Sequence, residues 1–391
     1  KVLNVPHLRF PEFSGEWNKY TINDLATVVG GGTPDTTVKS YWGGDIQWFT
    51  PSEIGKNKYV DFSKRTITRD GLDNSSAKLL PLHTILLSSR ATVGECSIAS
   101  NECTTNQGFQ SLIAKQCNID FLYYLIQTKK KDLIRNACGS TFLEISANEI
   151  RKIKVAVPVQ NEQEQIAKLL SLIDERIATQ NKIIEDLKKL KSAISQHLFS
   201  QEPNVWNRLD NLFVKGKAGG TPISTNKEYY NGNIPFLSIN DITRQGKYIW
   251  LTEKHISLNG LENSSAWIVP KHSLIMSMYA SVGLVTINQV PIATSQAMFS
   301  MLLRDKSLLD YLYYYLSYFK YRHIHKYLET GTQSNINADI VSGIMIPDYG
   351  YRHNMQIASM LQSIDMKIDN ESSILERYSQ QKNDLLSSLF I

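Results

Sequence analysis

The sequence predicts an α+β protein: two tandem globular α/β domains, each followed by a long helix, related as a pseudo-two-fold internal repeat. Three observations predict this class. The stretch GGTPDTTVKSYWGG at Gly31 returns as GGTPISTNKEYYNG at Gly219. Each copy contains short β-rich runs broken by turn residues. Each copy then ends in a long segment without glycine or proline, in which apolar residues follow helical spacing.

The repeat extends over nearly the whole chain of 391 residues. LDNSSA at Leu72 matches LENSSA at Leu261, and QIA occurs at Gln165 and again at Gln356. A period close to half the chain is far longer than the roughly 20–50 residues of a solenoid repeat. We therefore expect a duplicated domain, with a first globular domain at 1–158, a first helix at 159–202, a second globular domain at 203–350 and a second helix at 351–391.

Short apolar runs between turn residues predict the strands of both globular domains. In the first copy these runs are Ile46–Thr50, Thr84–Ser88, Cys96–Ser100 and Gln110–Ala114. In the second copy they are Ile234–Ser238, Ser273–Ser277, Leu284–Asn288 and Met298–Leu302. One helix is expected in each copy, at Asp120–Lys131 and at Ser307–Tyr318. Irregular domains of this kind have long loops, and binding residues are often found on loops.

Both long segments show the 4-3 apolar spacing of a coiled coil. The seam positions are Ile166, Leu170, Ile173, Ile177, Gln180, Ile184 and Leu187 in the first segment, and Ile357, Leu361, Ile364, Ile368, Glu371 and Leu375 in the second. Gln180 and Lys191 interrupt the first apolar series. Glu371 and Lys382 interrupt the second at the same two steps.

This shared register predicts that the two helices pair as an intramolecular antiparallel coiled coil. Each helix would be roughly 55–60 Å long at about 1.5 Å per residue. Gln180 and Glu371 lie near the helix midpoints, so antiparallel pairing would bring them to one level as a polar layer that fixes the register. The alternative is two long core helices that do not meet.

Composition and charge indicate an ordinary globular protein, which we expect to be cytoplasmic. The formal net charge of +5 permits nucleic-acid binding without demanding it. No apolar run reaches the roughly 18–20 residues of a membrane span, and no signal peptide is visible. All four cysteines lie in the first copy without CxxC spacing. We therefore expect reduced thiols rather than disulfides or a zinc site.

No catalytic or metal-binding pattern stands out. A methyltransferase acting on amino groups needs an Asn/Asp-Pro-Pro-aromatic motif, and the sequence contains no Pro-Pro. A phosphate-binding GxxxxGK[ST] loop is also absent. Asp365 and Lys367 form a nuclease-like fragment only on a predicted coiled-coil helix, and His323 and His325 have no counterpart in the first copy. We therefore expect a non-enzymatic chain that binds no metal and no cofactor.

The ordered motifs resemble the specificity subunit of type I restriction-modification systems over essentially the whole chain. LRFPEF at Leu8, both GGTP stretches, SRATVG at Ser89 and TNQGF at Thr105 carry this resemblance. The junction VPVQNEQEQIA at Val157 resembles the family's boundary between a target-recognition domain and a conserved helix. The second copy departs from the pattern, because Tyr279 replaces Arg90 and its junction lacks the glutamine-rich run.

The resemblance implies that each globular domain is a target-recognition domain that reads one half of a bipartite sequence in double-stranded DNA. The coiled coil would set the spacer and dock two modification (methyltransferase) subunits, and two restriction (motor-nuclease) subunits would join them. S-adenosylmethionine, ATP and Mg would then be bound by those partners, and the chain itself would catalyse nothing. Two other functions stay open: a self-sufficient DNA methyltransferase, and a coiled-coil assembly protein that does not bind DNA.

Polar and basic residues in loops that differ between the copies are the candidates for DNA contact. Side chains that reach base edges read sequence, whereas phosphate contacts position the protein. The candidates in the first copy are Thr50, Ser52, Lys56, Asn57, Arg90, Thr105, Asn106, Gln107, Ser140, Thr141 and Phe142. Those in the second copy are Ser238, Asn240, Arg244, Tyr279, Ser295, Gln296, Thr332, Gln333, Ser334 and Asn335. Gln107 and Gln296 are the same in both copies, so the alternative for them is a buried structural amide.

Overall fold

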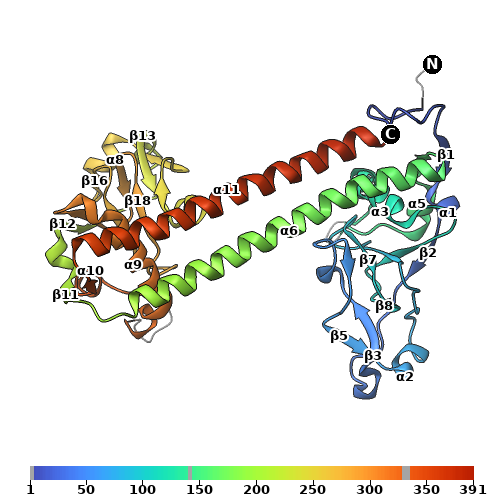
Figure 1. Ribbon diagram of the computed structural model, residues 1–391, viewed down its shortest axis with the longest axis horizontal. Coiled ribbons are helices and arrows are strands. Elements are labelled where there is room, and N and C mark those ends of the chain that lie inside the picture. The colour runs from blue at the N-terminus through green and yellow to red at the C-terminus, as the bar shows by residue number, and fades with distance from the viewer. Residues whose placement is uncertain (1–3, 140–142, 328–334) are drawn as a thin grey trace. The chain divides into compact units, whose positions relative to one another are not determined.

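The computed structural model describes residues 4–139, 143–327 and 335–391. The chain divides into two compact units, one of residues 1–182 with 372–391 and the other of residues 183–371. Each unit contains one globular α/β region and a part of each of two long helices, α6 (Gln160–Phe199) and α11 (Tyr351–Leu389) (Figure 1). The expected fold class, a repeated α/β region joined to two long helices, is confirmed.

Strands of the first unit form a sheet with the order β2-β9-β6-β7-β4, a smaller sheet β5-β3-β8 and the pair β1-β10. The strands are β1 (Asn18–Thr21), β2 (Ala26–Gly30), β3 (Trp42–Phe49), β4 (Tyr59–Val60), β5 (Arg65–Ile67), β6 (Ile85–Leu87), β7 (Cys96–Ala99), β8 (Cys103–Thr105), β9 (Gln110–Ala114) and β10 (Lys154–Val157). The helices are α1 (Ile22–Leu25), α2 (Arg69–Asp73), α3 (Ile119–Thr128), α4 (Lys130–Arg135) and α5 (Ala147–Lys152).

The second unit repeats this topology, with the orders β12-β20-β17-β18-β14 and β15-β13-β19-β16 and the pair β11-β21, and β16 is an additional strand of its smaller sheet. Its strands are β11 (Val205–Arg208), β12 (Phe213–Ala218), β13 (Tyr230–Leu237), β14 (Tyr248–Ile249), β15 (Lys254–Ile256), β16 (Ile268–Val269), β17 (Leu274–Ser277), β18 (Val285–Asn288), β19 (Ile292–Thr294), β20 (Met298–Leu303) and β21 (Met345–Asp348). Its helices are α7 (Ile239–Gln245), α8 (Leu258–Glu262), α9 (Leu309–Arg322) and α10 (Ala338–Ser342).

The predicted strands all occur, with ends that differ by a few residues. β9 has the predicted bounds, whereas β3 and β13 begin earlier than predicted, at Trp42 and Tyr230. The predicted helix at Asp120–Lys131 is divided between α3 and α4, because Lys129 leaves the regular helical conformation. Its counterpart α9 continues without a break to Arg322.

The repeated Gly-Gly pair is required because the backbone there passes very close to backbone atoms of neighbouring loops. A Cβ atom on Gly31 would lie 2.0 Å from the backbone oxygen of Asn106, and one on Gly219 would lie 2.0 Å from that of Thr294. Gly32 and Gly220 meet backbone atoms in the same way. No side chain fits at such distances, so the motif is needed by the packing of this loop in both copies.

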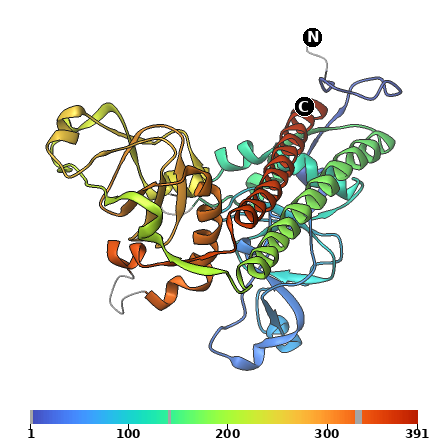
Figure 2. The ribbon, with the colours of Figure 1, turned by 60° about the vertical axis from the view of Figure 1, so that its left-hand side comes forward.

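The long helices pair in antiparallel fashion within each unit. In the first unit, Ile166 and Leu170 near the start of α6 share a buried core with Leu389 and Phe390 at the end of α11. Figures 1 and 2 both show these two helix ends side by side. In the second unit, the end of α6 and the start of α11 enter another core, to which Leu361 contributes. The antiparallel pairing is therefore confirmed, and the alternative of helices that do not meet is wrong.

The predicted seam positions of both helices are buried or half-buried. Gln180 and Glu371 are each only 7% exposed, although both are polar. Lys191 and Lys382, the other two interruptions of the apolar spacing, are half-buried. Within the described ranges, no helix is long and apolar enough to cross a membrane.

Candidate nucleic-acid interface

Two parallel strands bring the main candidate loops of the first unit together. β3 pairs with β8 in parallel, with Phe49 opposite Thr105, so the loops that follow both strands begin at one edge of the sheet. The amide of Asn106 donates to the carbonyl of Phe49 at 3.1 Å. As a result, Thr50 and Ser52 lie beside Asn106 and Gln107.

Local hydrogen bonds hold these loops in place. The Thr50 hydroxyl and backbone amide both donate to the Glu53 carboxylate, at 2.6 and 2.8 Å, and this capping box fixes the turn that carries Ser52. On the neighbouring loop, the Asn106 side-chain oxygen accepts a hydrogen bond from the amide of Gly108 at 2.9 Å. The loops are thus shaped before any ligand arrives.

Arg90 joins this surface from the turn that follows β6. The amide of Ser89 donates to the carbonyl of Gly108 at 2.8 Å, which places Arg90 next to the Asn106 loop. Ala91 adopts a φ of 64°, a left-handed conformation that is uncommon for a residue with a Cβ atom. The Arg90 guanidinium lies 3.8 Å from Glu144, and both side chains are about half exposed. Such an exposed ion pair contributes little to stability, so the guanidinium can exchange partners at low cost.

The second unit builds the equivalent surface from partly different side chains. β13 pairs with β19 in parallel, with Leu237 opposite Thr294, and the residues that follow them carry the candidates. The Met278 amide donates to the carbonyl of Ala297 at 2.7 Å, as Ser89 does to Gly108 in the first unit. Ala280 adopts a φ of 59°. The equivalent positions are Ser238, Asn240, Tyr279, Ser295 and Gln296.

We name these two sets the recognition surfaces. The first recognition surface consists of Thr50, Ser52, Arg90, Asn106 and Gln107, and the second consists of Ser238, Asn240, Tyr279, Ser295 and Gln296. Each set lies at the edge of its own domain where parallel strands end.

Gln107 and Gln296 are exposed, so the alternative that they are buried structural amides is wrong. The Gln107 side-chain oxygen accepts a hydrogen bond from the Thr33 hydroxyl at 2.5 Å, and Thr221 makes the same bond to Gln296. An amide oxygen has two lone pairs, so each glutamine can accept a further hydrogen bond as well as donate from its NH2 group. Sequence reasoning missed Thr33 and Thr221, although their place in the repeated GGTP motif was a signal.

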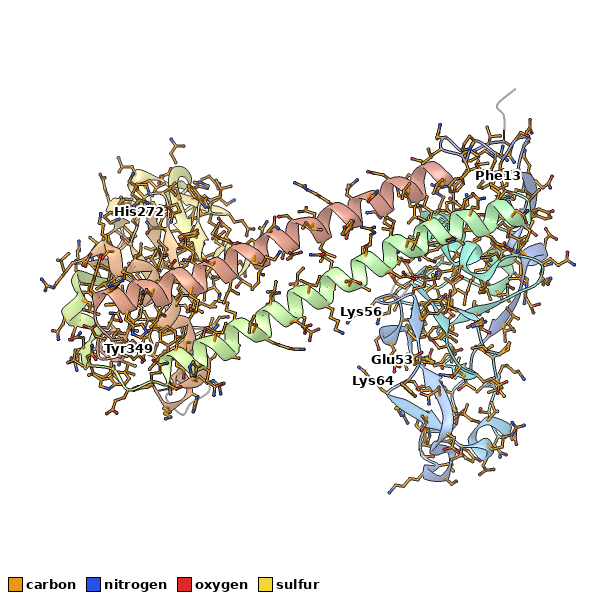
Figure 3. All side chains as sticks on the ribbon, viewed as in Figure 1. Phe13, Glu53, Lys56, Lys64, His272 and Tyr349 are labelled. Carbon is orange, nitrogen blue, oxygen red and sulfur yellow. The ribbon has the colours of Figure 1, made fainter. Side chains whose placement is uncertain are left out.

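Several other candidates lie away from the recognition surfaces. Thr105 is 1% exposed and lies beneath the loop that follows it. Lys56 and Asn57 line a cavity of about 760 Å³ beside the long helices, together with Ser171 of α6. Figure 3 shows Lys56 on the side of the domain next to α6. Exposed Arg244 lies in the last turn of α7.

Some candidates fall outside the described residues or at their border. Ser140, Thr141, Phe142, Thr332, Gln333 and Ser334 lie outside the described residues. Asn335 is half-buried and precedes Ile336, whose amide donates to the carbonyl of Met278 at 3.1 Å. Asn335 therefore lies close to Tyr279 on the second recognition surface.

The residues considered for catalysis have structural partners instead. Asp365 accepts hydrogen bonds from Tyr314 and Lys191, and Lys367 pairs with Glu371 one helical turn away. His323 packs against the ring of Phe319. Across the part of the chain that the structure describes, no group of three or more His, Cys, Asp or Glu residues is placed to hold a metal ion.

Comparison with known proteins connects this geometry to a family. The family model for the type I restriction modification DNA specificity domain matches the chain twice, at residues 14–189 and 203–377. The chain is 34% identical over 256 residues to the type I restriction enzyme MjaIX specificity subunit of Methanocaldococcus jannaschii, covering 59% of each chain. It is 29% identical over 175 residues to the EcoR124I/EcoR124II specificity subunit of Escherichia coli, covering 43% of each. These matches span about half the length of the relatives.

Two solved structures have a similar fold over nearly their whole length. The type I restriction-modification S subunit of M. genitalium covers 99% of both chains with a TM-score of 0.59 and 16% identity. A chain from a structural study of complex assembly in the type I R-M system covers 97% of this chain and 98% of its own, with a TM-score of 0.63 and 14% identity. At such low identity these structures support the fold.

Proposed function

This chain belongs to the type I restriction modification DNA specificity family, and from that premise we propose that it is the DNA-recognition subunit of a type I restriction-modification complex. Each globular domain reads one half of a bipartite target through its recognition surface. The long helices set the length of the unspecified spacer between the two halves. The chain supplies recognition, and the chemistry belongs to its partner subunits.

One observation carries this proposal: the two recognition surfaces share a backbone scaffold but differ in the side chains they present. Arg90 is replaced by Tyr279, and Asn106 by Ser295, at equivalent places on the same turns. A duplicated enzyme would be expected to keep the reactive groups in at least one copy, whereas a reader of two different half-sites must vary the side chains that touch bases. Different side chains at equivalent positions of a shared scaffold fit the second case.

The chemistry of the first recognition surface suits base readout. An arginine can donate two hydrogen bonds to O6 and N7 of guanine, and an asparagine or glutamine can pair with N6 and N7 of adenine. Arg90, Asn106 and Gln107 supply these groups on adjacent loops. Tyr279 on the second recognition surface offers a hydroxyl and an aromatic face instead, so we expect that unit to prefer different bases.

The proposed partners follow from the modest charge and the family. A net charge of +5 is small for a protein that would hold a duplex alone, because phosphate contacts by lysine and arginine dominate affinity for DNA. We propose that two modification subunits bind the chain and supply further phosphate contacts together with S-adenosylmethionine. Two restriction subunits, with ATP and Mg, would complete the restriction complex.

The proposal is tested by grafting one recognition surface onto the other. The variant carries Thr50→Ser, Ser52→Asn, Arg90→Tyr and Asn106→Ser, which gives the first unit the side chains of the second. We expect its complex with the modification subunit to methylate genomic DNA at sites with an altered or relaxed first half and an unchanged second half. Replacing Arg90 alone by Ala should cost about 1–3 kcal/mol in binding and relax one position.

The matched control replaces Lys56 and Asn57 by Ala in the same domain, because these residues face the helix side. The control should leave the recognised bases unchanged. Sequencing of methylated positions in a host that expresses both subunits measures every case. Changes in both halves after the graft, or an unchanged target, would contradict the proposal.

A further inference from the structure

The domain and the long helices of the first unit are joined by a network of charged and aromatic groups. Lys382 of α11 pairs with Asp174 of α6 at 2.7 Å. The other oxygen of Asp174 accepts a hydrogen bond from the Tyr124 hydroxyl of α3 at 2.7 Å. One carboxylate therefore connects both long helices to the globular domain.

A lysine of the domain completes this connection. Lys58 precedes β4, pairs with Asp120 of α3 at 2.7 Å and donates to the Ser171 hydroxyl of α6 at 2.6 Å. Its ammonium lies 4.8 Å from the centre of the Tyr124 ring, within the range of a cation–π interaction. The Lys58 side chain is only 9% exposed, so these groups hold it in one place.

The second unit contains a similar network with the long helices exchanged, except that its domain lysine, Lys247, donates to the Tyr314 hydroxyl at 3.1 Å and not to a long helix. Here the carboxylate, Asp365, comes from α11 and the lysine, Lys191, comes from α6; they pair at 2.5 Å. Tyr314 of α9 donates to Asp365 at 2.8 Å. The domain lysine is Lys247, which pairs with Asp310 at 2.7 Å and lies 4.4 Å from the centre of the Tyr314 ring.

We call these groups the junction networks: Lys58, Asp120, Tyr124, Asp174 and Lys382 in the first unit, and Lys247, Asp310, Tyr314, Asp365 and Lys191 in the second. They account for the lysine interruption in each apolar seam. Lys191 and Lys382 take positions where an apolar side chain would strengthen helix pairing. A half-buried ion pair contributes little net stability compared with apolar packing, and such groups are best known for fixing geometry.

The cavity of about 760 Å³ beside the first junction network supports a geometric role. It is lined by the loop before β4, by α3 and by both long helices, among them Lys58, Asp174 and Lys382. The domain and the helices are separated across this space, so the hydrogen bonds and ion pairs of the network connect them there, beside the apolar core that α3 shares with both helices. A carboxylate that bonds to both other elements constrains how those elements lie relative to each other.

We propose that the junction networks fix the orientation of each recognition domain on the helix pair and thereby restrict the spacer length that the complex accepts. Their members are positioning residues that touch no DNA. The expected effect on spacer length rests on the proposed function. The orientation of each domain on the helices does not, because it can be measured in the free chain. Base preference within each half-site should not depend on the networks.

The first test is Lys191→Met, which keeps the length of the side chain and removes its charge. DNA substrates carry the two half-sites with spacers from two base pairs shorter to two longer, and methylation by the complex is measured. We expect the wild type to methylate DNA with one spacer length best. In the variant, the ratio of methylation between this spacer and the others should fall about tenfold, which corresponds to about 1.4 kcal/mol. Base preference within the half-sites should stay unchanged.

Lys189→Met is the matched control, because Lys189 lies on the same helix and its pair with Glu185 is well exposed, at 68% and 65%. The control should behave like the wild type. Tyr314→Phe is a second and milder variant that keeps the ring and removes the hydroxyl, which donates to Asp365 and accepts from Lys247. It should lower the spacer preference in the same direction, by a smaller factor.

A second measurement reads orientation in the free full-length chain. Spin labels are placed at the exposed positions Lys188 on α6 and Lys271 in the second domain, both within the second unit. The background is Cys138→Ser, because Cys138 is exposed while burial of Cys96, Cys103 and Cys117 raises the pKa of each thiol to about 12. Lys191→Met should broaden the distance distribution, and Lys189→Met should not.

The outcomes separate the two proposals. An unchanged spacer preference in both Lys191→Met and Tyr314→Phe would overturn the junction-network proposal, whether or not the distances broaden. A wild-type complex that methylates no split target would instead refute the proposed function, and the distance measurement would still decide whether the networks fix orientation. A broadened distance distribution with a relaxed spacer preference would support both.

Discussion

The two copies of the repeat place an equivalent tryptophan in different environments. Trp17 is 3% exposed, and its ring packs edge-on against Phe121 and Phe390. Its indole nitrogen donates to Glu162 at 3.2 Å. The equivalent Trp206 in the second unit is 48% exposed. A motif kept in both copies can thus be core in one and surface in the other.

The difference follows from what covers each domain. In the first unit, the segment before Trp17 turns back over the end of α11, where the amide of Leu8 donates to the carbonyl of Ser388 at 2.9 Å. Arg9 of that segment makes two hydrogen bonds of 2.8 Å to Glu162, a carboxylate with no exposed surface. This bond raises the pKa of Arg9, although burial opposes the rise. The charged pair therefore forms a lid over Trp17.

In the second unit, the segment before the equivalent tryptophan comes directly from the end of α6 and forms no such cover. His353 stands where Glu162 stands in the first copy and is exposed. The start of α11 is fixed by Asn354, which is 4% exposed and donates to Asp348 at 2.8 Å, and its counterpart Gln163 is equally buried at the start of α6. Equivalent positions in a duplicated protein therefore need separate structural accounts.

Replacing each tryptophan by alanine gives the largest expected effect. Trp17→Ala removes a buried aromatic ring from the first core and should destabilise that unit by about 3–5 kcal/mol. Trp206→Ala removes a half-exposed ring and should cost less than about 1 kcal/mol. Hydrogen exchange of backbone amides in β9 and β20 reads the two units separately. Equal losses in both units would show that the burial difference has no energetic consequence.

Glycine substitutions sharpen the comparison by testing a feature that the copies share. Gly31→Ala and Gly219→Ala each place a methyl group about 2.0 Å from a backbone oxygen, so each should destabilise its own unit by about 1–3 kcal/mol. Because the loops involved carry Asn106 and Ser295, DNA modification should also weaken. The same hydrogen-exchange measurement applies. A variant of one copy that left its unit intact would mean that the close approach relaxes easily there.

Acidification should produce the smallest effect, and we expect it in the second unit. Burial lowers the pKa of His323 below its ordinary value of 6.5, and Lys326 and His325 act in the same direction. The unfolded chain then binds the proton more readily, so stability is complete above about pH 6.5 and falls as the pH drops below that value. Exchange in α9, corrected for its intrinsic pH dependence, should rise between pH 7.5 and 5.5 in the wild type. His323→Gln should reduce this rise, and an equal rise in the variant would exclude His323 as its source.

The sequence by itself determined the duplication, the strand-rich character of each domain and the pairing of the long helices. These features depend on local patterns: glycines at close approaches, alternation between turn and apolar residues, and 4-3 spacing in a segment without helix breakers. The seam from Ile166 to Leu187 is buried or half-buried as expected. The pairing face of a long helix can be predicted from sequence because every turn must place apolar residues on the same face toward the same partner.

The tertiary structure alone decided which loop residues share a surface and what the interruptions of the seam do. Lys56 follows Ser52 by only four residues, yet it faces the cavity beside the helices while Ser52 lies on the first recognition surface. Lys382 meets Asp174 although more than half of the chain separates them in sequence. Such contacts leave no local period, because each depends on where a distant element packs. They are determined only when the whole unit has folded.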